Sequence, residues 1–226
     1  MSKTYFISGI DTDTGKSIAT GLMAKWLLNQ GKHVITQKMI QTGCVGIAED
    51  ILTHRKLMGV DLFEEDKDKT TCPITFPYPA SPHLSAALEN QIIDPVVIRN
   101  STAILSRKYE YLLVEGAGGL HVPLNDQTNI IDYIQKEKHP LILVTSSKLG
   151  SINHTLMSLE LCKNRGIEVS GLIYNHYPNN SKEILEDSSK VFERFLERWF
   201  PECVLIQMPE IKDQDQAEIN FKELFS

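Results

Sequence analysis

The residues with the most distinctive chemistry form a glycine-bounded loop near the N-terminus. The segment reads Gly9-Ile-Asp-Thr-Asp-Thr-Gly15-Lys16-Ser17 and lies between a short apolar run and a helical pattern. In a strand–loop–helix of this kind, backbone N–H groups and the helix N-terminus bind phosphate oxygens. Lys16 is then placed to reach the β- and γ-phosphates of a nucleotide, and the Ser17 hydroxyl to bind Mg²⁺. The common motif has four residues before its Gly-Lys pair and this loop has five, so a glycine-containing turn that caps a helix is the alternative.

A second glycine-rich segment places a carboxylate at the end of an apolar run. It reads Tyr111-Leu-Leu-Val-Glu115-Gly-Ala-Gly-Gly119. P-loop enzymes place a second Mg²⁺-side carboxylate at such a strand end, and glycines let the backbone approach phosphates closely. Together the two segments predict an ATP site that contains Mg²⁺. We expect ATP to be bound by Asp13, Thr14, Gly15, Lys16, Ser17, Ile18, Glu115, Gly116, Ala117 and Gly118.

The elements that must position these residues alternate between short apolar runs and longer helical patterns. Runs that are rich in β-branched residues and apolar on both faces are typical of strands buried in a parallel sheet. We predict an α/β fold with a doubly wound, mostly parallel sheet flanked by helices, as in P-loop NTPases, in one domain spanning residues 1–226. The predicted strands are Tyr5–Ser8, Val34–Thr36, Tyr111–Val114, Leu141–Val144, Val169–Ile173 and Val204–Ile206. The predicted helices are Lys16–Asn29, Pro95–Ser106, Ile130–Lys136, Ile152–Asn164 and Ser181–Trp199.

The stretch from Val60 to Pro82 interrupts this alternation. It is polar at first and then rich in proline. Because strand–helix alternation resumes after it, we expect a long ordered loop or a functional flap there instead of a linker between domains.

Composition and charge limit the class of protein. Of the 226 residues 42% are hydrophobic and 23% are charged, which is ordinary for a globular protein. The formal net charge of −6 argues against a broad nucleic-acid-binding face. No apolar run approaches the roughly 20 residues that cross a bilayer. We therefore expect a cytoplasmic protein that binds neither nucleic acid nor a membrane.

The cysteines and histidines do not suggest a metal site. The four cysteines are far apart, which suits unpaired thiols in a reducing compartment; they are Cys44, Cys72, Cys162 and Cys203. Several histidines lack the spacing of metal ligands, so we expect surface or hydrogen-bonded polar roles for His33, His54, His121 and His139.

Five ordered motifs resemble those of the dethiobiotin synthases. The loop Gly9–Ser17 has that family's five-residue spacing, and the segment Val114–Gly119 is also matched. The other three motifs are Lys38-Met-Ile-Gln-Thr42-Gly43, Ser81-Pro82-His83 and Lys148-Leu-Gly-Ser-Ile-Asn153-His154. The resemblance covers the chain from residue 5 to about residue 177. Within these motifs Ile10 and Met39 depart from the family pattern, which has a threonine and a proline there.

The resemblance implies a reaction and its partners. In that family 7,8-diaminopelargonate takes up CO₂ on one amine, and ATP phosphorylates the resulting carbamate to a carbamic–phosphoric anhydride. The second amine then closes the ring to dethiobiotin and releases phosphate, with ADP as the other product, in an Mg²⁺-dependent step of biotin biosynthesis. The family also implies a homodimer with its active sites at the interface.

The resemblance also assigns roles to individual residues. Lys38 and Lys16 are the expected catalytic residues, the first at the carbamate and the second at the γ-phosphate. Asp50 is expected to join Ser17 and Glu115 around Mg²⁺, with Glu49 as its rival because the alignment is loose there. Thr12 and Thr42 are expected to contact the diamine substrate.

Two further groups of residues take their roles from the resemblance. A helix N-terminus is expected to bind the substrate carboxylate of the partner subunit, through Lys148, Gly150, Ser151, Ile152 and Asn153; a plain helix capped by Ser151 is the alternative. The nucleobase is expected to lie against Asn175, His176, Pro209 and Glu210. His176 stands where a family pattern has aspartate, which leaves the nucleotide preference open.

Three rival functions remain on sequence alone. An amidating enzyme of the same P-loop branch would use glutamine or ammonia and would not need Lys38. A small-molecule kinase is disfavoured because the arginines are scattered and form no lid. A partitioning-type ATPase switch is disfavoured because Ile10 and Asp11 occupy the positions where that class has a second lysine.

Overall fold

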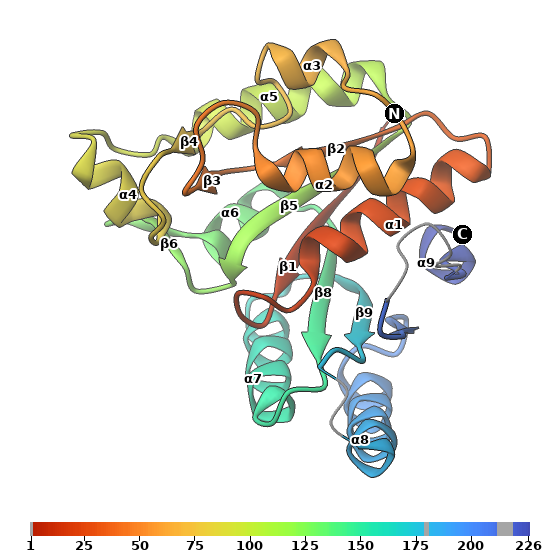
Figure 1. Ribbon diagram of the computed structural model, residues 1–226. Coiled ribbons are helices and arrows are strands. Elements are labelled where there is room, and N and C mark those ends of the chain that lie inside the picture. The colour runs from red at the N-terminus through yellow and green to blue at the C-terminus, as the bar shows by residue number, and fades with distance from the viewer. Residues whose placement is uncertain (1, 179–180, 212–218) are drawn as a thin grey trace.

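The central feature of the computed structural model is a six-stranded parallel sheet (Figure 1). The structure describes residues 2–178, 181–211 and 219–226. The strand order is β10-β9-β8-β1-β5-β2, and every ladder in this sheet is parallel. All six predicted strands are present, as β1 (Lys3–Gly9), β2 (Val34–Lys38), β5 (Tyr111–Gly119), β8 (Leu141–Ser146), β9 (Val169–Asn175) and β10 (Val204–Met208). The predicted fold class is confirmed.

The sheet is buried on both faces because successive side chains of each strand enter different cores. In β1, Phe6 packs in one hydrophobic cluster and Ile7 in the other, as the alternation of a strand requires. The cluster around Phe6 includes side chains of α5 (Pro95–Lys108), α6 (Ile130–Glu137), α7 (Ser151–Asn164) and α8 (Lys182–Trp199). The cluster around Ile7 includes side chains of α1 (Lys16–Asn29), α2 (Glu49–Met58) and α9 (Lys222–Phe225). Helices thus cover both faces.

The five predicted helices are confirmed within one or two residues, and local signals explain their ends. The Asp94 carboxylate caps α5 by accepting from the N–H of Val96, and Pro95 supplies a preset first turn. The Ser181 hydroxyl caps α8 by accepting from the N–H of Ile184. Among the described helices, none is long and apolar enough to cross a membrane.

The structure adds elements that the sequence patterns do not predict. Helix α2 is the longest of them, and α4 (Pro82–Leu88) begins at the last of the clustered prolines. The stretch expected as a loop contains α3 (Glu64–Lys67) and β4 (Thr75–Phe76), so that prediction is wrong in these two places. Strand β4 pairs in parallel with β3 (Gln41–Thr42), and β6 (Pro123–Asn125) forms a hairpin with β7 (Thr128–Asn129).

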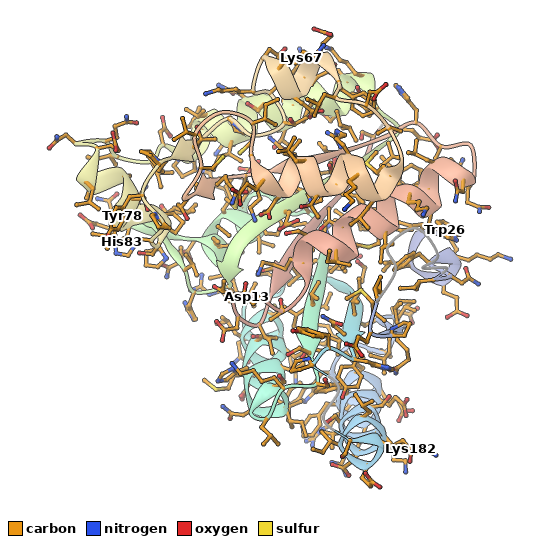
Figure 2. The ribbon with its side chains drawn as sticks, in the orientation of Figure 1. Asp13, Trp26, Lys67, Tyr78, His83 and Lys182 are labelled. Carbon is orange, nitrogen blue, oxygen red and sulfur yellow. The ribbon has the colours of Figure 1, made fainter. Side chains whose placement is uncertain are left out.

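The two ends of the sheet carry different features. Asp13 lies in the loop beyond the carboxyl end of β1, whereas Trp26 lies at the far end of α1 (Figure 2). There the Trp26 ring stacks on Phe225 of α9, with 6.0 Å between ring centroids. The described end of the tail, residues 219–226, therefore packs far from the loop that carries Asp13. In open α/β sheets ligands bind beyond the carboxyl ends of the strands.

Candidate active site

A cavity of about 900 Å³ lies at the carboxyl end of the sheet. It is lined by segments that follow β1, β2, β5, β9 and β10. Fourteen of the predicted site residues line it: Thr12, Asp13, Gly15, Lys16, Ser17, Ile18, Lys38, Thr42, Asp50, Glu115, Ala117, Gly118, Asn175 and Glu210. The proline-rich segment contributes Pro79, Ala80, Ser81 and Pro82. One cavity thus joins the two glycine-rich segments to the segments around Lys38 and Ser81, which are matched only by resemblance.

The first glycine-rich loop has the backbone of an anion cradle. Gly15 precedes α1 with a φ of 92°, and an added Cβ there would lie 2.5 Å from the Asn175 side-chain nitrogen. Glycine is therefore required at this position both by conformation and by space. The Lys16 ammonium donates to the carbonyl oxygen of Asp11 at 2.9 Å, so it lies across the loop. Burial, followed by the charge of Lys38, lowers the pKa of Lys16 to about 8.

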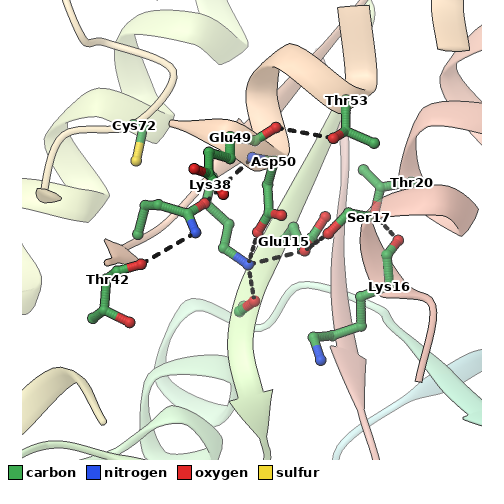
Figure 3. Close-up of polar contacts among 12 residues, drawn as sticks. Lys16, Ser17, Thr20, Lys38, Thr42, Glu49, Asp50, Thr53, Cys72 and Glu115 are labelled. Carbon is green, nitrogen blue, oxygen red and sulfur yellow. Dashed lines mark hydrogen bonds and ion pairs between the residues drawn. The ribbon is translucent and has the colours of Figure 1, made fainter. Parts of the chain in front are cut away.

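Lys38 and Glu115 meet because they are partners across the β2–β5 ladder. The Lys38 ammonium donates to Glu115 Oε1 at 2.9 Å and to the Gly116 carbonyl oxygen at 2.9 Å. It also lies 2.6 Å from Asp50 Oδ2 (Figure 3). These three contacts use all three N–H donors of the lysine. Glu115 Oε1 accepts a further hydrogen bond from the Ser17 hydroxyl at 2.8 Å.

The charges at this centre hold one another in their ionised forms. Burial alone would raise the pKa of Glu115, but the charge of Lys38 and the hydrogen bond from His54 outweigh it, so the pKa is held below its usual range. Burial alone would lower the pKa of Lys38, but the charges of Glu115 and Asp50 outweigh it and raise that pKa. The centre is thus a lysine cation between two carboxylates.

The same groups suit Mg²⁺ in their chemistry. Ser17, Asp50 and Glu115 offer the oxygen ligands that this ion prefers. The Lys38 ammonium, which lies against both carboxylates, shows that the pair accommodates positive charge. Glu49, the rival of Asp50, has an exposed side chain and does not line the cavity. Within the described ranges no group of three or more His, Cys, Asp or Glu side chains is placed to hold a metal alone. An Mg²⁺ ion at these carboxylates would therefore also need the serine hydroxyl and oxygens of the bound nucleotide as ligands.

Asn175 ties the nucleotide loop to the segment after β9. Its side-chain nitrogen donates to the Thr14 carbonyl oxygen at 3.0 Å, and its side-chain oxygen accepts from the N–H of Tyr177 at 3.0 Å. Asn175, Tyr177 and Met208 line the end of the cavity near Gly15. Tyr177 was missed by sequence reasoning because the resemblance ends at that residue.

Four predicted nucleotide-binding residues do not line the cavity. These are Thr14, Gly116, His176 and Pro209. The Thr14 and Gly116 carbonyl oxygens instead accept hydrogen bonds from Asn175 and Lys38. The His176 ring lies away from the cavity, with Nε2 2.8 Å from Gln207 Oε1. The side chain at this position therefore contacts Gln207, whereas its neighbours Asn175 and Tyr177 face the cavity.

The predicted carboxylate-binding turn lies outside the cavity of its own chain. None of Lys148, Gly150, Ser151, Ile152 and Asn153 lines it. The Ser151 hydroxyl is buried and lies 3.1 Å from that of Ser146, while Leu149 beside it is 78% exposed.

The residue that sequence reasoning missed at the centre itself is His54. It is 0% exposed, and its Nε2 lies 2.8 Å from Glu115 Oε2. The expectation that His54 is hydrogen-bonded is confirmed, but its position beside Glu115 was not foreseen. A signal for it exists, because His54 follows Asp50 by four residues and the two share one face of α2.

The fold and this geometry together define a P-loop nucleoside triphosphate-binding enzyme. A parallel sheet, a lysine-bearing anion cradle after β1 and a serine–carboxylate pair beside it are the parts that this class shares. A family model described as an AAA domain matches residues 3–218.

Sequence relatives identify the family within that class. The ATP-dependent dethiobiotin synthetase BioD 2 of Pasteurella multocida is 54% identical over 201 residues, covering 89% of this chain and 94% of that protein. The protein of the same name from Haemophilus influenzae is 60% identical over 178 residues, covering 79% and 93%. The chain belongs to the ATP-dependent dethiobiotin synthetase family and is an ATP-dependent enzyme of the ligase kind.

Solved structures agree on the fold. The cell division protein FtsY of Thermotoga maritima has a TM-score of 0.56 at 16% identity, covering 100% of this chain and 67% of that one. A ParA family ATPase of Chlorobium tepidum has a TM-score of 0.53 at 17% identity, covering 99% and 89%. At these identities the likeness shows the fold alone.

Proposed function

We propose that this enzyme carboxylates 7,8-diaminopelargonate with CO₂ and closes the ring to dethiobiotin, using ATP and Mg²⁺. The observation that carries the proposal is the Lys38 ammonium, held at the edge of the cavity by Glu115, Asp50 and the Gly116 carbonyl. A carbamate is an anion that must come close to an even more negative triphosphate. A fixed lysine cation between them offsets that repulsion without reorganisation during the reaction.

The chemical steps follow from the balance of atoms. One substrate amine adds to CO₂ and loses a proton, giving the carbamate. A carbamate oxygen attacks the γ-phosphorus, and the bond to the ADP oxygen breaks. The second amine then attacks the carbamate carbon, and phosphate leaves with the bridging oxygen as the amine loses its proton. In this sequence Lys38 stabilises the carbamate, and Lys16 the charge on the migrating phosphoryl group.

The remaining site residues bind and orient. Ser17, Asp50 and Glu115 would hold Mg²⁺, which neutralises charge on the phosphates when it is bound. Thr12 and Thr42 line the cavity where the diamine end of the substrate is to be held. Asn175, Tyr177 and Glu210 line the part of the cavity assigned to the nucleobase; His176 is assigned no direct contact.

The proposal includes a homodimer and a cytoplasmic location. The turn from Lys148 to Asn153 is assigned to the substrate carboxylate of a second copy, because the backbone N–H groups of a helix start attract anions and this turn is outside its own cavity. The four cysteines are all free, which suits a reducing compartment.

The test is an assay of the purified protein with 7,8-diaminopelargonate, ¹³C-bicarbonate, ATP and Mg²⁺. We expect dethiobiotin that carries one ¹³C, formed in equal amount to the phosphate released. Omitting bicarbonate should stop both products. Phosphate release that instead requires glutamine or ammonia would favour the amidating rival and contradict the proposal.

A further inference from the structure

His54 stands at the centre of a buried chain of hydrogen bonds that ends on Glu115. Its Nε2 lies 2.8 Å from Glu115 Oε2, and its Nδ1 lies 3.0 Å from the Thr36 hydroxyl. Thr36 and Lys38 are two residues apart on β2 and therefore project from the same face of the sheet. Asp50 and His54 project from one face of α2 toward them. The two elements thus bring Lys38 and His54 to the Glu115 carboxylate, with Asp50 and Thr36 as the partners of those two side chains.

The direction of the hydrogen bonds is set by Glu115, whose ionised carboxylate can only accept, so His54 Nε2 is the donor of that pair; Arg55 agrees with this direction. Its Nη1 donates to the Thr36 hydroxyl at 2.8 Å, and an arginine has no acceptor. The Thr36 oxygen therefore accepts from Arg55, and its single proton is free to be donated to His54 Nδ1. With Nδ1 as the acceptor, the ring proton of a neutral His54 lies on Nε2 and is donated to Glu115.

Arg55 is itself fixed from outside the site. Its Nε and Nη2 donate to the two carboxylate oxygens of Asp66, each at 2.8 Å. Asp66 also accepts from the Thr71 hydroxyl and from the N–H of Phe63. A bidentate pair of this kind fixes the plane of the guanidinium as well as its position. The position of the guanidinium against the Thr36 hydroxyl is therefore built into the fold.

We propose that His54 is a positioning residue that fixes the Glu115 carboxylate for Mg²⁺–nucleotide binding through a directed relay from Arg55 and Thr36. Ser17 and Lys38 both bond to Glu115 Oε1, whereas His54 holds Oε2. Losing His54 leaves Oε2 without its protein donor and frees the carboxylate to rotate about its last bond. Residues that orient a metal-side carboxylate in this way typically matter about 10- to 100-fold for metal affinity.

The competing interpretation is that His54 is only a well-packed core histidine. It predicts that any substitution lowers stability and that Mg²⁺ dependence follows stability. The inference rests on the proposed function only in assigning Mg²⁺ to Ser17, Asp50 and Glu115. Its tests use nucleotide and Mg²⁺ without the diamine, so a failed ring-closure assay and a failed positioning test are distinguishable.

The first experiment examines the protonation of His54 in the free protein. Long-range ¹H–¹⁵N NMR near neutral pH, with the His54 signals assigned from their loss in His54→Gln, should show a protonated Nε2 and an unprotonated Nδ1. Thr36→Val, which removes the donor to Nδ1, should shift the Nδ1 resonance away from its wild-type value, and Thr36→Ser, which keeps the hydroxyl, should retain that value. A proton on Nδ1, in the neutral ring or in the imidazolium, would contradict the relay.

The second experiment measures Mg²⁺-dependent binding of a β,γ-imido ATP analogue by calorimetry. The amide nitrogen of glutamine reaches about as far as Nε2, whereas that of asparagine reaches only as far as Nδ1. We expect His54→Asn and His54→Leu to raise the half-saturating Mg²⁺ concentration by about tenfold or more. His54→Gln should restore binding to within about threefold of the wild type, and nucleotide binding without Mg²⁺ should stay within about twofold throughout.

Matched measurements separate positioning from packing. The unfolding temperature of each variant is recorded, and His139→Gln, the same substitution outside the cavity, should leave Mg²⁺ dependence unchanged. The proposal is overturned if His54→Leu binds Mg²⁺–nucleotide like the wild type. It is also overturned if the Gln, Asn and Leu variants lose Mg²⁺ affinity in step with their unfolding temperatures. If His54→Leu fails to fold, the comparison of His54→Gln with His54→Asn and the NMR result decide between positioning and packing.

Discussion

At the scale of single residues, the protein groups of the site form a balanced set of charges. Two lysines, Lys16 and Lys38, face two carboxylates, Asp50 and Glu115. The repulsion between the lysines contributes to the lowered pKa of Lys16. Under the proposed function, the negative triphosphate would face the two lysines and Mg²⁺ would face the two carboxylates. The two ligands would then bind best together, since either one alone would leave part of this set of charges uncompensated.

The role assigned to Lys38 is tested by Lys38→Ala. Loss of the cation should lower the rate of ring closure by at least about 100-fold, because charge stabilisation at the transferred group is removed. Binding of the imido ATP analogue, measured by calorimetry, should change by only a few-fold, since Lys16 and the loop backbone remain. Near-normal turnover would remove Lys38 from the mechanism.

The Ser17 hydroxyl is tested by Ser17→Ala. We expect nucleotide affinity in the presence of Mg²⁺ to fall by about tenfold or more, while affinity in its absence is little changed. Ser106→Ala, on α5 and outside the cavity, is the matched control. Equal Mg²⁺ dependence in Ser17→Ala and the wild type would contradict the assignment of the hydroxyl to the metal.

At the scale of elements, the sequence predicted the parts of the fold whose apolar pattern is strong. The six strands of the sheet are apolar on both faces, and the five predicted helices have clear ends. Helix α2 was not predicted because two of the five side chains that it buries, His54 and Arg55, are polar. Hydrogen bonds to Thr36, Asp66 and Glu115 stabilise the two polar side chains in the core. These partners lie 11 or more residues away along the chain, so a local sequence pattern does not reveal them.

The site residues also divide into those predicted from a local pattern and those that depend on contacts between distant segments. The nucleotide loop was predictable because its chemistry lies within nine consecutive residues. Asp50 was placed only by resemblance, and His54 was not placed at all, because both depend on how α2 packs against β2 and β5. The cavity wall at Tyr177 could not be inferred either, since it depends on the turn after β9.

The buried pair of Arg55 and Asp66, which joins α2 to α3, predicts a pH dependence of stability. Burial alone would raise the pKa of Asp66, but Arg55 outweighs it and holds the pKa below the usual range. A lowered folded-state pKa gives stability that is present above about pH 4, the unfolded value, and is lost as the pH falls below it. Asp66→Asn should therefore cost about 3 kcal/mol in urea unfolding at neutral pH, with a smaller difference in acid.

The control for this prediction is Glu64, an exposed carboxylate on the same short helix, α3, as Asp66. Glu64 pairs with Lys67 at the surface, and its side chain is 83% exposed. Glu64→Gln should change the free energy of unfolding by no more than about 0.5 kcal/mol at any pH. A destabilisation by Asp66→Asn that stays constant from neutral pH into acid would contradict the lowered pKa.

At the scale of the whole molecule, the active site and the described C-terminal helix occupy opposite ends of the sheet. The cavity opens beyond the carboxyl ends of the strands, and α9 packs on the far end of α1. The turn that precedes α7 is exposed at Leu149 but does not line the cavity. A symmetric dimer in which each copy lends this turn to the other would complete two sites at once.

Mixing two inactive variants tests the shared site. Lys38→Ala removes the lysine from one chain, and a Lys148→Ala, Asn153→Ala double variant removes side chains of the lent turn. In a randomly mixed dimer population, one site in each hybrid is intact, so activity should recover to about a quarter of the wild type after subunit exchange. No recovery beyond the mean of the two variants, although exchange is verified by mass spectrometry, would contradict a shared site.

The proposed function requires that a carbamate oxygen is phosphorylated during ring closure. The most direct measurement is transfer of ¹⁸O from labelled CO₂ to inorganic phosphate in a single turnover with ATP and 7,8-diaminopelargonate, kept shorter than the exchange of CO₂ oxygen with water. Phosphorylation of a carbamate oxygen predicts phosphate that carries one ¹⁸O for each dethiobiotin formed, because the bridging oxygen leaves with phosphorus. Dethiobiotin formed alongside unlabelled phosphate would contradict it.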